Sequence, residues 1–261
     1  MAAVDISIFS LIIAILLFSI PIVLSRVYRI GLIKSLLYSA IRMSIQLVLI
    51  GFFLKYLFVW NNTILNIAWL GLMILVAVFS VIRSSSMKTN KVLIPAYISF
   101  SLATFGIVLF LNIVVIRLDY VFDARYLIVL GGMLLGNSLR GNIIGITAFY
   151  TNIKKDRKKF LYTLSLGASF NEAIFPYLRE SIQLALKPTF ASMATMGIVA
   201  LPGMMTGVIL GGTSLELAIK YQIMIMIGIV TSTITSILLT ILMTLPVCFS
   251  KYGTLNQDIF V

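Results

Sequence analysis

The sequence of 261 residues contains no histidine, a single cysteine (Cys248) and only eight acidic residues. Without histidine no Ser–His–Asp triad can form, and one cysteine allows neither an intrachain disulfide nor a CxxC metal site. The chain also lacks a G-x-x-x-x-G-K-[ST] phosphate-binding loop, so ATP would have to be bound by another protein. These absences argue against a hydrolytic enzyme, a zinc protein and an ATPase.

Long apolar runs dominate what is present. Hydrophobic residues make up 61% of the chain and charged residues 11%, against about 45–50% and about 25% in soluble domains. Helices are expected, because a span needs about 20 residues and every backbone amide must be hydrogen-bonded within lipid. We predict one all-α membrane domain over residues 1–261 with about seven spans. The predicted spans cover residues 6–24, 43–59, 64–82, 92–116, 126–150, 188–212 and 221–249.

The acidic residues all fall outside these predicted spans. They are Asp5, Asp119, Asp123, Asp156, Glu172, Glu180, Glu216 and Asp258. Proton-driven transporters and aspartyl intramembrane proteases keep carboxylates within the membrane, and hard cations are bound by carboxylate oxygens. A proton-driven transporter, an aspartyl intramembrane protease and a carboxylate site for a hard cation are therefore all disfavoured, and uphill transport would need energy from a separate subunit.

Basic residues gather on one side of the predicted topology. With the N-terminus outside and the C-terminus in the cytoplasm, 15 of the 20 Lys and Arg residues fall on the inner side, where basic loops are retained. Lys55, Arg117, Arg125 and Lys220 fall outside, and Arg140 lies within a span. Topology and contact with anionic lipid account for the net charge of +12 better than nucleic-acid binding does. We predict a multi-pass protein of the plasma (inner) membrane.

Residues 154–187 form the predicted cytoplasmic loop after the fifth span. Apolar residues recur there at near-helical spacing from Leu161, and Gly167 is suited to a turn. Pro176 and Pro188 are expected to interrupt the helical pattern beyond that turn. We predict a short amphipathic helix, a turn and a second helix, which either dock a partner protein or only stabilise the loop.

Several runs resemble known permeases. Leu166-Gly-Ala-Ser169, followed by Lys187-Pro188, is similar to the cytoplasmic coupling loop of ABC transporter permeases. The Fet-type iron-export permeases, a family that includes the plant aluminium-sensitivity permeases, resemble the chain more closely. The matching runs are Leu201-Pro-Gly-Met-Met-Thr-Gly207, Ala218-Ile-Lys-Tyr-Gln-Ile223, Arg42-Met-Ser-Ile-Gln-Leu47 and Gly136-Asn-Ser138. Two positions depart from the family: Val208 stands where Gln is usual, and Arg140 where a small or neutral residue is usual.

The resemblance implies a membrane subunit of an ABC transporter. Two such permeases would pair with two cytoplasmic ATPases, which would bind ATP and magnesium, and this chain would hold no cofactor. Gly167, Ala168, Ser169 and Glu172 would insert into the ATPase. The family is linked to iron export in bacteria and to aluminium tolerance in plants, where a nucleotide sugar is a proposed cargo. The alternative that the residues leave open is an ion-coupled secondary transporter or a channel.

One group of candidate pathway residues is implied by the resemblance. It comprises Pro202, Gly203, Met204, Met205, Thr206, Gly207, Tyr221 and Gln222. The two Met thioethers would suit a soft metal such as Cu(I), although Met also fills gaps in apolar cores. Glycines four residues apart, as at 203 and 207 or at 141 and 145, suit either close helix packing or a moving seam.

A second group is polar and lies within the spans. A charge near the bilayer centre costs at least about 2.5–3.5 kcal/mol, so Arg140 should face protein or water. Asn137 lies nearly one turn before it, and Arg42 and Gln46 are four residues apart in the second span. We predict that these four residues line a polar cavity suited to an anion, a metal chelate or a phosphorylated molecule. The alternative is that Arg140 snorkels or bonds backbone carbonyls.

Overall fold

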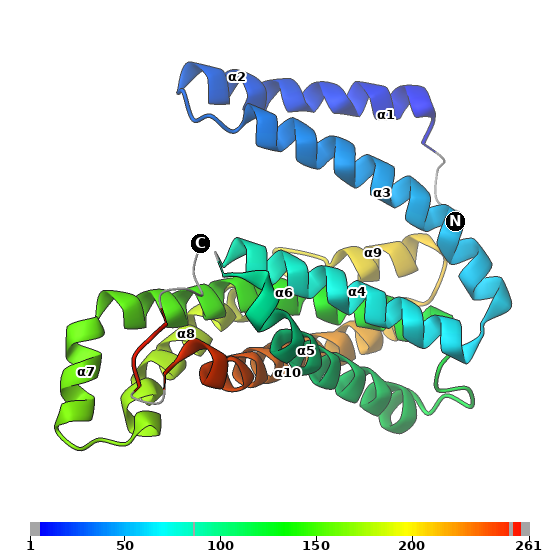
Figure 1. Cartoon of the computed structure of the whole chain (residues 1–261). Helices are drawn as coiled ribbons and strands as arrows, with labels where there is room; N and C mark the ends of the chain where they lie inside the picture. The colour runs from blue at the N-terminus through cyan, green and yellow to red at the C-terminus, as the bar shows by residue number, and fades with distance from the viewer. Residues whose placement is uncertain (1–5, 86, 251–252, 257–261) are drawn as a thin grey trace.

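The computed structural model describes residues 6–85, 87–250 and 253–256, and the regular elements of these residues are helices (Figure 1). Asp5 and Asp258 lie outside them. The helices are α1 (Ile8–Ile15), η1 (Leu16–Phe18), α2 (Ser19–Val27), α3 (Ile33–Trp60), α4 (Thr63–Ser84), α5 (Thr89–Phe110), η2 (Leu111–Ile116), α6 (Ala124–Lys155), α7 (Arg157–Ser165), α8 (Phe170–Thr195), α9 (Gly203–Leu210) and α10 (Leu215–Cys248).

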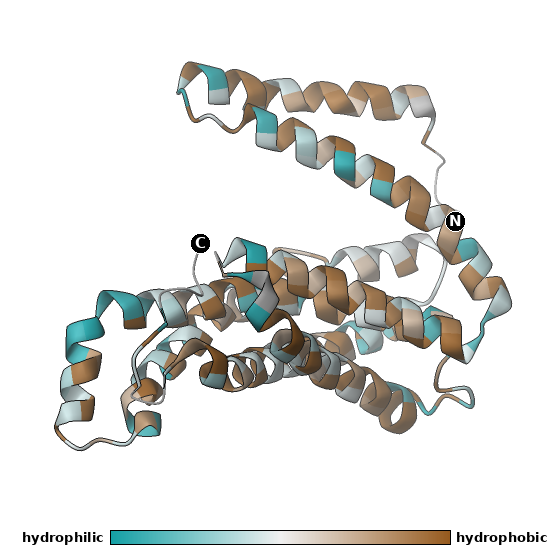
Figure 2. Cartoon of the chain, in the orientation of Figure 1, coloured by the Kyte–Doolittle hydropathy of each residue, from teal (hydrophilic) through white to brown (hydrophobic). Residues whose placement is uncertain are grey.

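Six helical stretches among the described residues are long and apolar enough to cross a membrane. They are Phe9–Val27, Ile33–Trp60, Thr63–Ser84, Lys91–Ile116, Ala124–Lys155 and Leu215–Cys248. Figure 2 shows mostly hydrophobic residues along these helices, with hydrophilic ones near helix ends, around α7 and at a few positions within α3. The predicted all-α, polytopic class is confirmed, and the chain is a multi-pass membrane protein.

The helices α6 and α10 lie side by side and run in the same direction. Three side-chain hydrogen bonds join residues that are each 94 positions apart. The pairs are Ser138 with Ser232 (3.1 Å), Asn142 with Ser236 (2.7 Å) and Tyr150 with Thr244 (2.6 Å). A constant offset is possible only between parallel helices. Because these groups are buried in an apolar bundle, each must find its partner there.

The helix α4 also runs parallel to α6. At one end, the amide of Ala124 donates to the side chain of Asn61 (2.8 Å). At the other end, the hydroxyl of Thr147 donates to that of Ser85 (3.2 Å). The C-terminal end of α4 therefore lies at the same end of the bundle as the basic run 154–159.

Because α6 and α10 are parallel, the chain between them must run back to the end of the bundle where α6 began. The helix α8 provides this antiparallel segment. The ring of Phe170, at the start of α8, lies 5.1 Å from that of Phe249, just past the end of α10. At the other end, Gln222 near the start of α10 donates to the sulfur of Met196, which caps α8 (3.6 Å). With 26 residues, α8 is about 39 Å long. It therefore carries the chain back along most of α10, which has 34 residues.

This arrangement corrects the sequence prediction in two places. The predicted span 188–212 is not one helix: α8 ends at Thr195, residues 196–202 are irregular, and α9 comes after them. Pro176 and Pro188 do not interrupt α8, which continues through both. The prolines remove backbone hydrogen bonds, and packing within the bundle can offset that loss. The helix α8 supplies such packing, because it buries one face against its neighbours. This face includes Ala173, Ile174, Tyr177, Ser181 and Ala185.

Glycines let α6 approach its neighbours closely. A Cβ atom added at Gly141 would lie 2.4 Å from Cγ2 of Thr233, and one at Gly145 would lie 3.1 Å from Cγ2 of Ile237. Among the two readings of this glycine pair, the structure thus supports tight helix packing, here between α6 and α10. By contrast, a Cβ at Gly136 would meet no atom within 4 Å.

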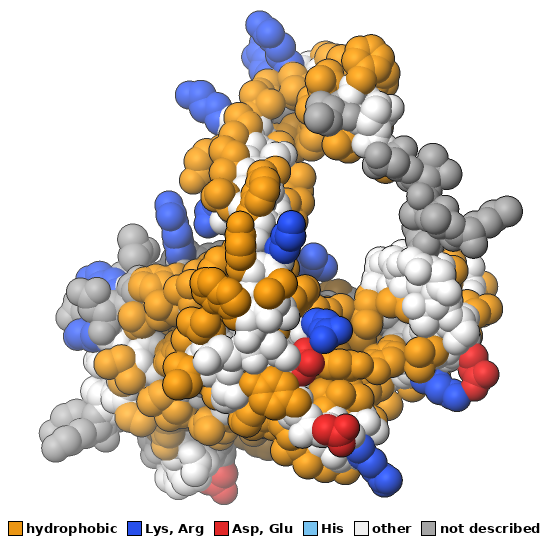
Figure 3. All heavy atoms as spheres, turned by 90° about the vertical axis from the view of Figure 1, so that its right-hand side faces the viewer, with side chains coloured by type: hydrophobic (Ala, Val, Ile, Leu, Met, Phe, Trp, Pro, Cys, Tyr) orange, Lys and Arg blue, Asp and Glu red, His pale blue; other side chains and the backbone are white. Residues whose placement is uncertain are grey.

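The N-terminal helices stand apart from this bundle. The segment α1–α2 folds back on α3 through a turn in which Arg29 and Gly31 have positive φ angles of 52° and 77°, and the resulting hairpin extends away from the other helices (Figure 1). Figure 3 shows open space between hairpin and bundle. Leu57 is the buried residue of α3, and Phe53 stacks on Trp69 of α4 at 4.1 Å. The hairpin therefore meets the bundle mainly near the C-terminal end of α3.

Candidate functional site

The turn between α7 and α8 is held by two local devices. Gly167 has a φ of +92°, which favours glycine. Ser169 and Glu172 form a capping box: the Ser169 amide donates to the Glu172 carboxylate (2.7 Å), and the Glu172 amide donates to the Ser169 hydroxyl (3.3 Å). The side-chain and then the backbone hydrogen bonds of Ser169 hold the pKa of the Glu172 carboxyl below its usual range. Of the four predicted coupling residues, Gly167, Ala168 and Ser169 lie in this turn and Glu172 lies in the first turn of α8.

The turn is anchored from one side and open on the other. Phe160 of α7 is 2% exposed, and its ring meets those of Phe170, Tyr177 and Phe249 at centroid distances of 6.3, 6.1 and 6.0 Å. Three apolar side chains beside the turn remain exposed. They are Tyr162 (65%), Leu166 (70%) and Phe175 (61%). These three exposed side chains form an apolar knob beside the packed ring of Phe160 and next to the basic run 154–159. A protrusion of this kind is suited to entering a groove of a partner protein.

A cleft of about 1420 Å³ lies between α3, α4 and α6. Its wall is mostly apolar, with Phe53 and Trp69 stacked near one end. Gly136 lines it from α6. The cleft is larger than most small-molecule pockets, which measure about 300–1,000 Å³.

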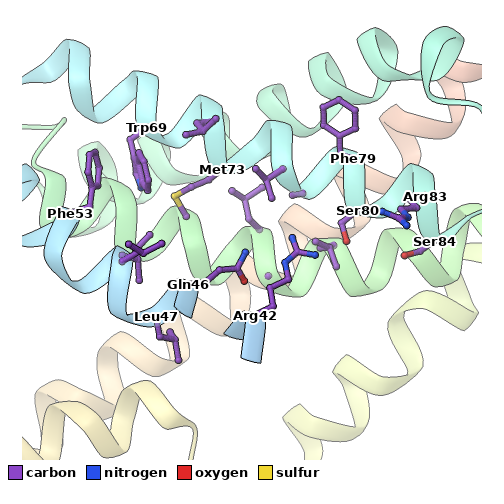
Figure 4. A pocket seen from close by; sticks show the side chains of 18 of the residues that line it. Arg42, Gln46, Leu47, Phe53, Trp69, Met73, Phe79, Ser80, Arg83 and Ser84 are labelled. Carbon is purple, nitrogen blue, oxygen red and sulfur yellow. The ribbon is translucent and has the colours of Figure 1, made fainter. Parts of the chain in front are cut away.

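The polar residues of this cleft come from two helices. Arg42 and Gln46 project side by side from α3, and Ser80, Arg83 and Ser84 lie on α4 (Figure 4). No lining residue is acidic. The described residues form two ion pairs, Arg125 with Asp123 and Lys220 with Glu216. Neither Arg42 nor Arg83 has a carboxylate partner within the described part of the chain, so the cleft presents positive charge.

The four predicted polar residues do not meet in this cleft. Arg42 and Gln46 line it, but Asn137 and Arg140 are not among its lining residues. Asn137 is half-buried and donates to the carbonyl of Met133 (2.9 Å), while Arg140 is exposed.

The other predicted pathway residues lie between the end of α8 and the start of α10. Pro202 caps α9, and the hydroxyl of Thr206 donates to the carbonyl of Gly203 (2.8 Å). A Cβ at Gly203 or Gly207 would meet nothing within 4 Å. These glycines therefore do not serve close packing within the described part of the chain.

The methionine pair gains no metal ligands from its surroundings. Met204 and Met205 are both half-buried, and Met204 packs against the apolar core. Residues 6–85, 87–250 and 253–256 contain no group of three or more His, Cys, Asp or Glu side chains that could hold a metal ion. Gln222 is buried and bonds Met196, and Tyr221 is half-buried. For the two methionines, the surroundings therefore favour packing over metal binding.

Sequence reasoning missed Ser80, Arg83 and Ser84. Arg83 was interpreted only as an inner-side charge that fixes topology. The spacing i, i+3, i+4 places the three on one helical face, and this polar face at the end of an apolar span was the available signal. That the face is turned toward Arg42 depends on how α3 and α4 pack.

The fold and these sites define a multi-pass, all-helical membrane protein with one basic cleft and one exposed turn. The sequence pattern of the family described as "Uncharacterised protein family (UPF0014)" matches residues 8–249. The chain belongs to this family.

Relatives in bacteria and plants are similar over most of the chain. The "Probable iron export permease protein FetB" of Escherichia coli (strain K12) is 33% identical over 221 residues, which cover 83% of this chain and 82% of the relative. The "UPF0014 membrane protein STAR2" of Oryza sativa subsp. japonica is 29% identical over 80% of this chain and 72% of its own. "Protein ALUMINUM SENSITIVE 3" of Arabidopsis thaliana is 28% identical, with 79% and 74% covered. No solved structure matches.

Proposed function

We propose that this chain is the membrane permease subunit of an ABC transporter in the plasma (inner) membrane. It pairs with a separate cytoplasmic ATPase that binds ATP and magnesium, in a complex of two permeases and two ATPases. The observation that carries this proposal is the turn between α7 and α8, which exposes Leu166 on a fixed base. ABC permeases carry a coupling loop that resembles this segment.

The cargo we propose is iron, or a metal-related or anionic substrate, moved outward. Two observations support this assignment. A relative with 33% identity carries the name of a probable iron export permease, and Arg140 places a positive charge within the span Ala124–Lys155, which favours an anionic cargo or a metal chelate. The pathway candidates are Asn137 and Arg140 on α6 with the α9 residues Gly203 to Gly207.

Copurification tests the coupling assignment. Leu166→Glu places a charge on the knob without changing the backbone, and Gly167→Arg adds bulk at the turn itself. Leu215→Glu is the matched control, since Leu215 is also exposed (56%) but begins α10 at the opposite end of the bundle. We expect the first two variants to lose the ATPase and the control to keep it.

Undiminished ATPase binding by both turn variants would remove the coupling assignment. For the complex in lipid nanodiscs, ATP hydrolysis is then measured with iron salts, iron chelates and nucleotide sugars. Stimulation by one class names the cargo. If the wild-type chain binds no ATPase at all, the ion-coupled secondary transporter becomes the better account.

A further inference from the structure

The cleft between α3 and α4 has a polar end and an apolar end. Asn61 and Asn62 form the turn that joins the two helices. Arg42 lies 19 residues before Asn61, and Arg83 lies 21 residues after Asn62. Measured along its own helix, each of the two residues therefore lies about 30 Å from that turn, at 1.5 Å per residue.

The apolar end lies toward the turn. Phe53 is eight residues before Asn61 (61 − 53), and Trp69 is seven residues after Asn62 (69 − 62). Their stacked rings lie at 4.1 Å and line the cleft. The polar and apolar ends are therefore separated along the helix axes.

The distance of about 30 Å from the turn to each arginine matches the thickness of a membrane. The hydrocarbon core of a bilayer is about 30 Å thick. The α3–α4 turn is polar, with Asn61 and Asn62, and comes after the exposed Trp60 and Tyr56 (67% and 59%), the residue types found at a membrane interface. When that turn lies at one interface and both helices cross the bilayer upright, Arg42 and Arg83 reach the headgroup level of the other.

The electrostatics of the cleft call for an anion. Two guanidinium groups line one space, with the amide of Gln46 and the hydroxyls of Ser80 and Ser84 beside them and no acidic lining residue. Guanidinium groups bind phosphate oxygens through two parallel hydrogen bonds. The basic run 154–159 lies at the same end of the bundle, and such runs face anionic leaflets.

We propose that the cleft binds an anionic phospholipid from the surrounding bilayer. Its phosphate lies between Arg42 and Arg83, and an acyl chain runs along the apolar wall toward Phe53 and Trp69. The lipid fills the space between the N-terminal hairpin and the bundle. This site requires neither the ATPase nor the cargo of the proposed function, so each can fail without the other.

Native mass spectrometry of the purified full chain in detergent tests the site by titration with phosphatidylglycerol and with phosphatidylcholine. The double variant Arg42→Gln/Arg83→Gln should bind phosphatidylglycerol about tenfold more weakly, as expected for lost charge-assisted hydrogen bonds. The control Arg26→Gln/Lys34→Gln removes the same charge from exposed positions that do not line the cleft and should change binding less than about twofold.

A steric variant tests the apolar wall. Gly136→Leu should fold, because a Cβ there meets nothing within 4 Å, but its side chain should project into the cleft and weaken the binding of both lipids. Three outcomes would overturn the proposal. They are phosphatidylglycerol binding unchanged in the double variant, equal loss in the control variant, and displacement of the lipid by equimolar inorganic phosphate, which would indicate a site for free phosphate.

Discussion

Three glycines of α6 differ in the space available to a methyl group, and this difference predicts a ranked series of stabilities. A Cβ at Gly136 meets nothing within 4 Å, one at Gly145 lies 3.1 Å from Ile237, and one at Gly141 lies 2.4 Å from Thr233. Non-bonded carbon atoms pack at about 3.5–4.0 Å. Alanine at 141 therefore requires a displacement of more than about 1 Å.

The atom that must move at position 141 is not free to do so. Thr233 is 1% exposed, and rotating its side chain would remove its hydroxyl from that of Ser138 (3.5 Å). Overpacking of this kind costs about 1–3 kcal/mol. The gain in helix propensity from Gly to Ala, about 1 kcal/mol, is common to the three variants and cancels when they are compared. Gly136→Ala should thus exceed Gly141→Ala in stability by about 1–3 kcal/mol, with Gly145→Ala between them.

Thermal unfolding of the detergent-solubilised protein measures this order. One kcal/mol corresponds to about 2–4 °C for a chain of this size, so Gly141→Ala should melt about 2–12 °C below Gly136→Ala. Adding Thr233→Ser removes the obstructing methyl group but keeps the hydroxyl, and should restore most of the loss. Equal melting temperatures for the three variants, or no rescue by Thr233→Ser, would refute the reasoning.

Two further predictions concern the turn between α7 and α8. Phe160→Ala removes a buried aromatic ring, which costs about 3–5 kcal/mol in a core, so hydrogen exchange across α7 should quicken, whereas Tyr162→Ala on the exposed face should leave it unchanged. Because the pKa of Glu172 is lowered in the folded protein, its cap contributes above the carboxyl's unfolded pKa and is lost as the pH falls through the folded value. Normalised protection of the first turn of α8 should therefore drop in acid, and Glu172→Gln, which retains an acceptor, should not show this drop; an identical acid response in both proteins would contradict it.

The helical class and most elements of the fold could be predicted from the sequence, but the length of α8, which continues through Pro176 and Pro188 to Thr195, could not. Its first 18 residues carry Glu172, Arg179, Glu180 and Lys187, a content that resembles a loop when hydropathy alone is considered. The same residues form a helix because the opposite stripe, with Ala173 and Ala185, is buried against neighbours. Only that tertiary contact distinguishes a polar helix within a bundle from a surface loop.

The candidate sites divide in the same way. The turn at Gly167 depends on local chemistry, a positive φ angle and a capping box four residues long, and its helix–turn–helix form was predicted from the sequence. The cleft depends on which faces of α3, α4 and α6 meet. Spacing on one helix could therefore pair Arg42 with Gln46, but it could not show that Arg83 lines the same cleft or that Arg140 does not.

The constant offset between α6 and α10 also determines which parts can move. A shift of either helix by one turn, about 5.4 Å, would break the three buried pairs together and drive Thr233 and Ile237 past Gly141 and Gly145. Hydrogen bonds also join α4 to α6 near both of its ends, so α4, α6 and α10 form one rigid unit. The hairpin of α1–α3 contacts that rigid unit chiefly where Phe53 stacks on Trp69. We expect the hairpin to rotate as a unit about that contact, so that a small rotation near Phe53 produces a larger displacement of Arg42.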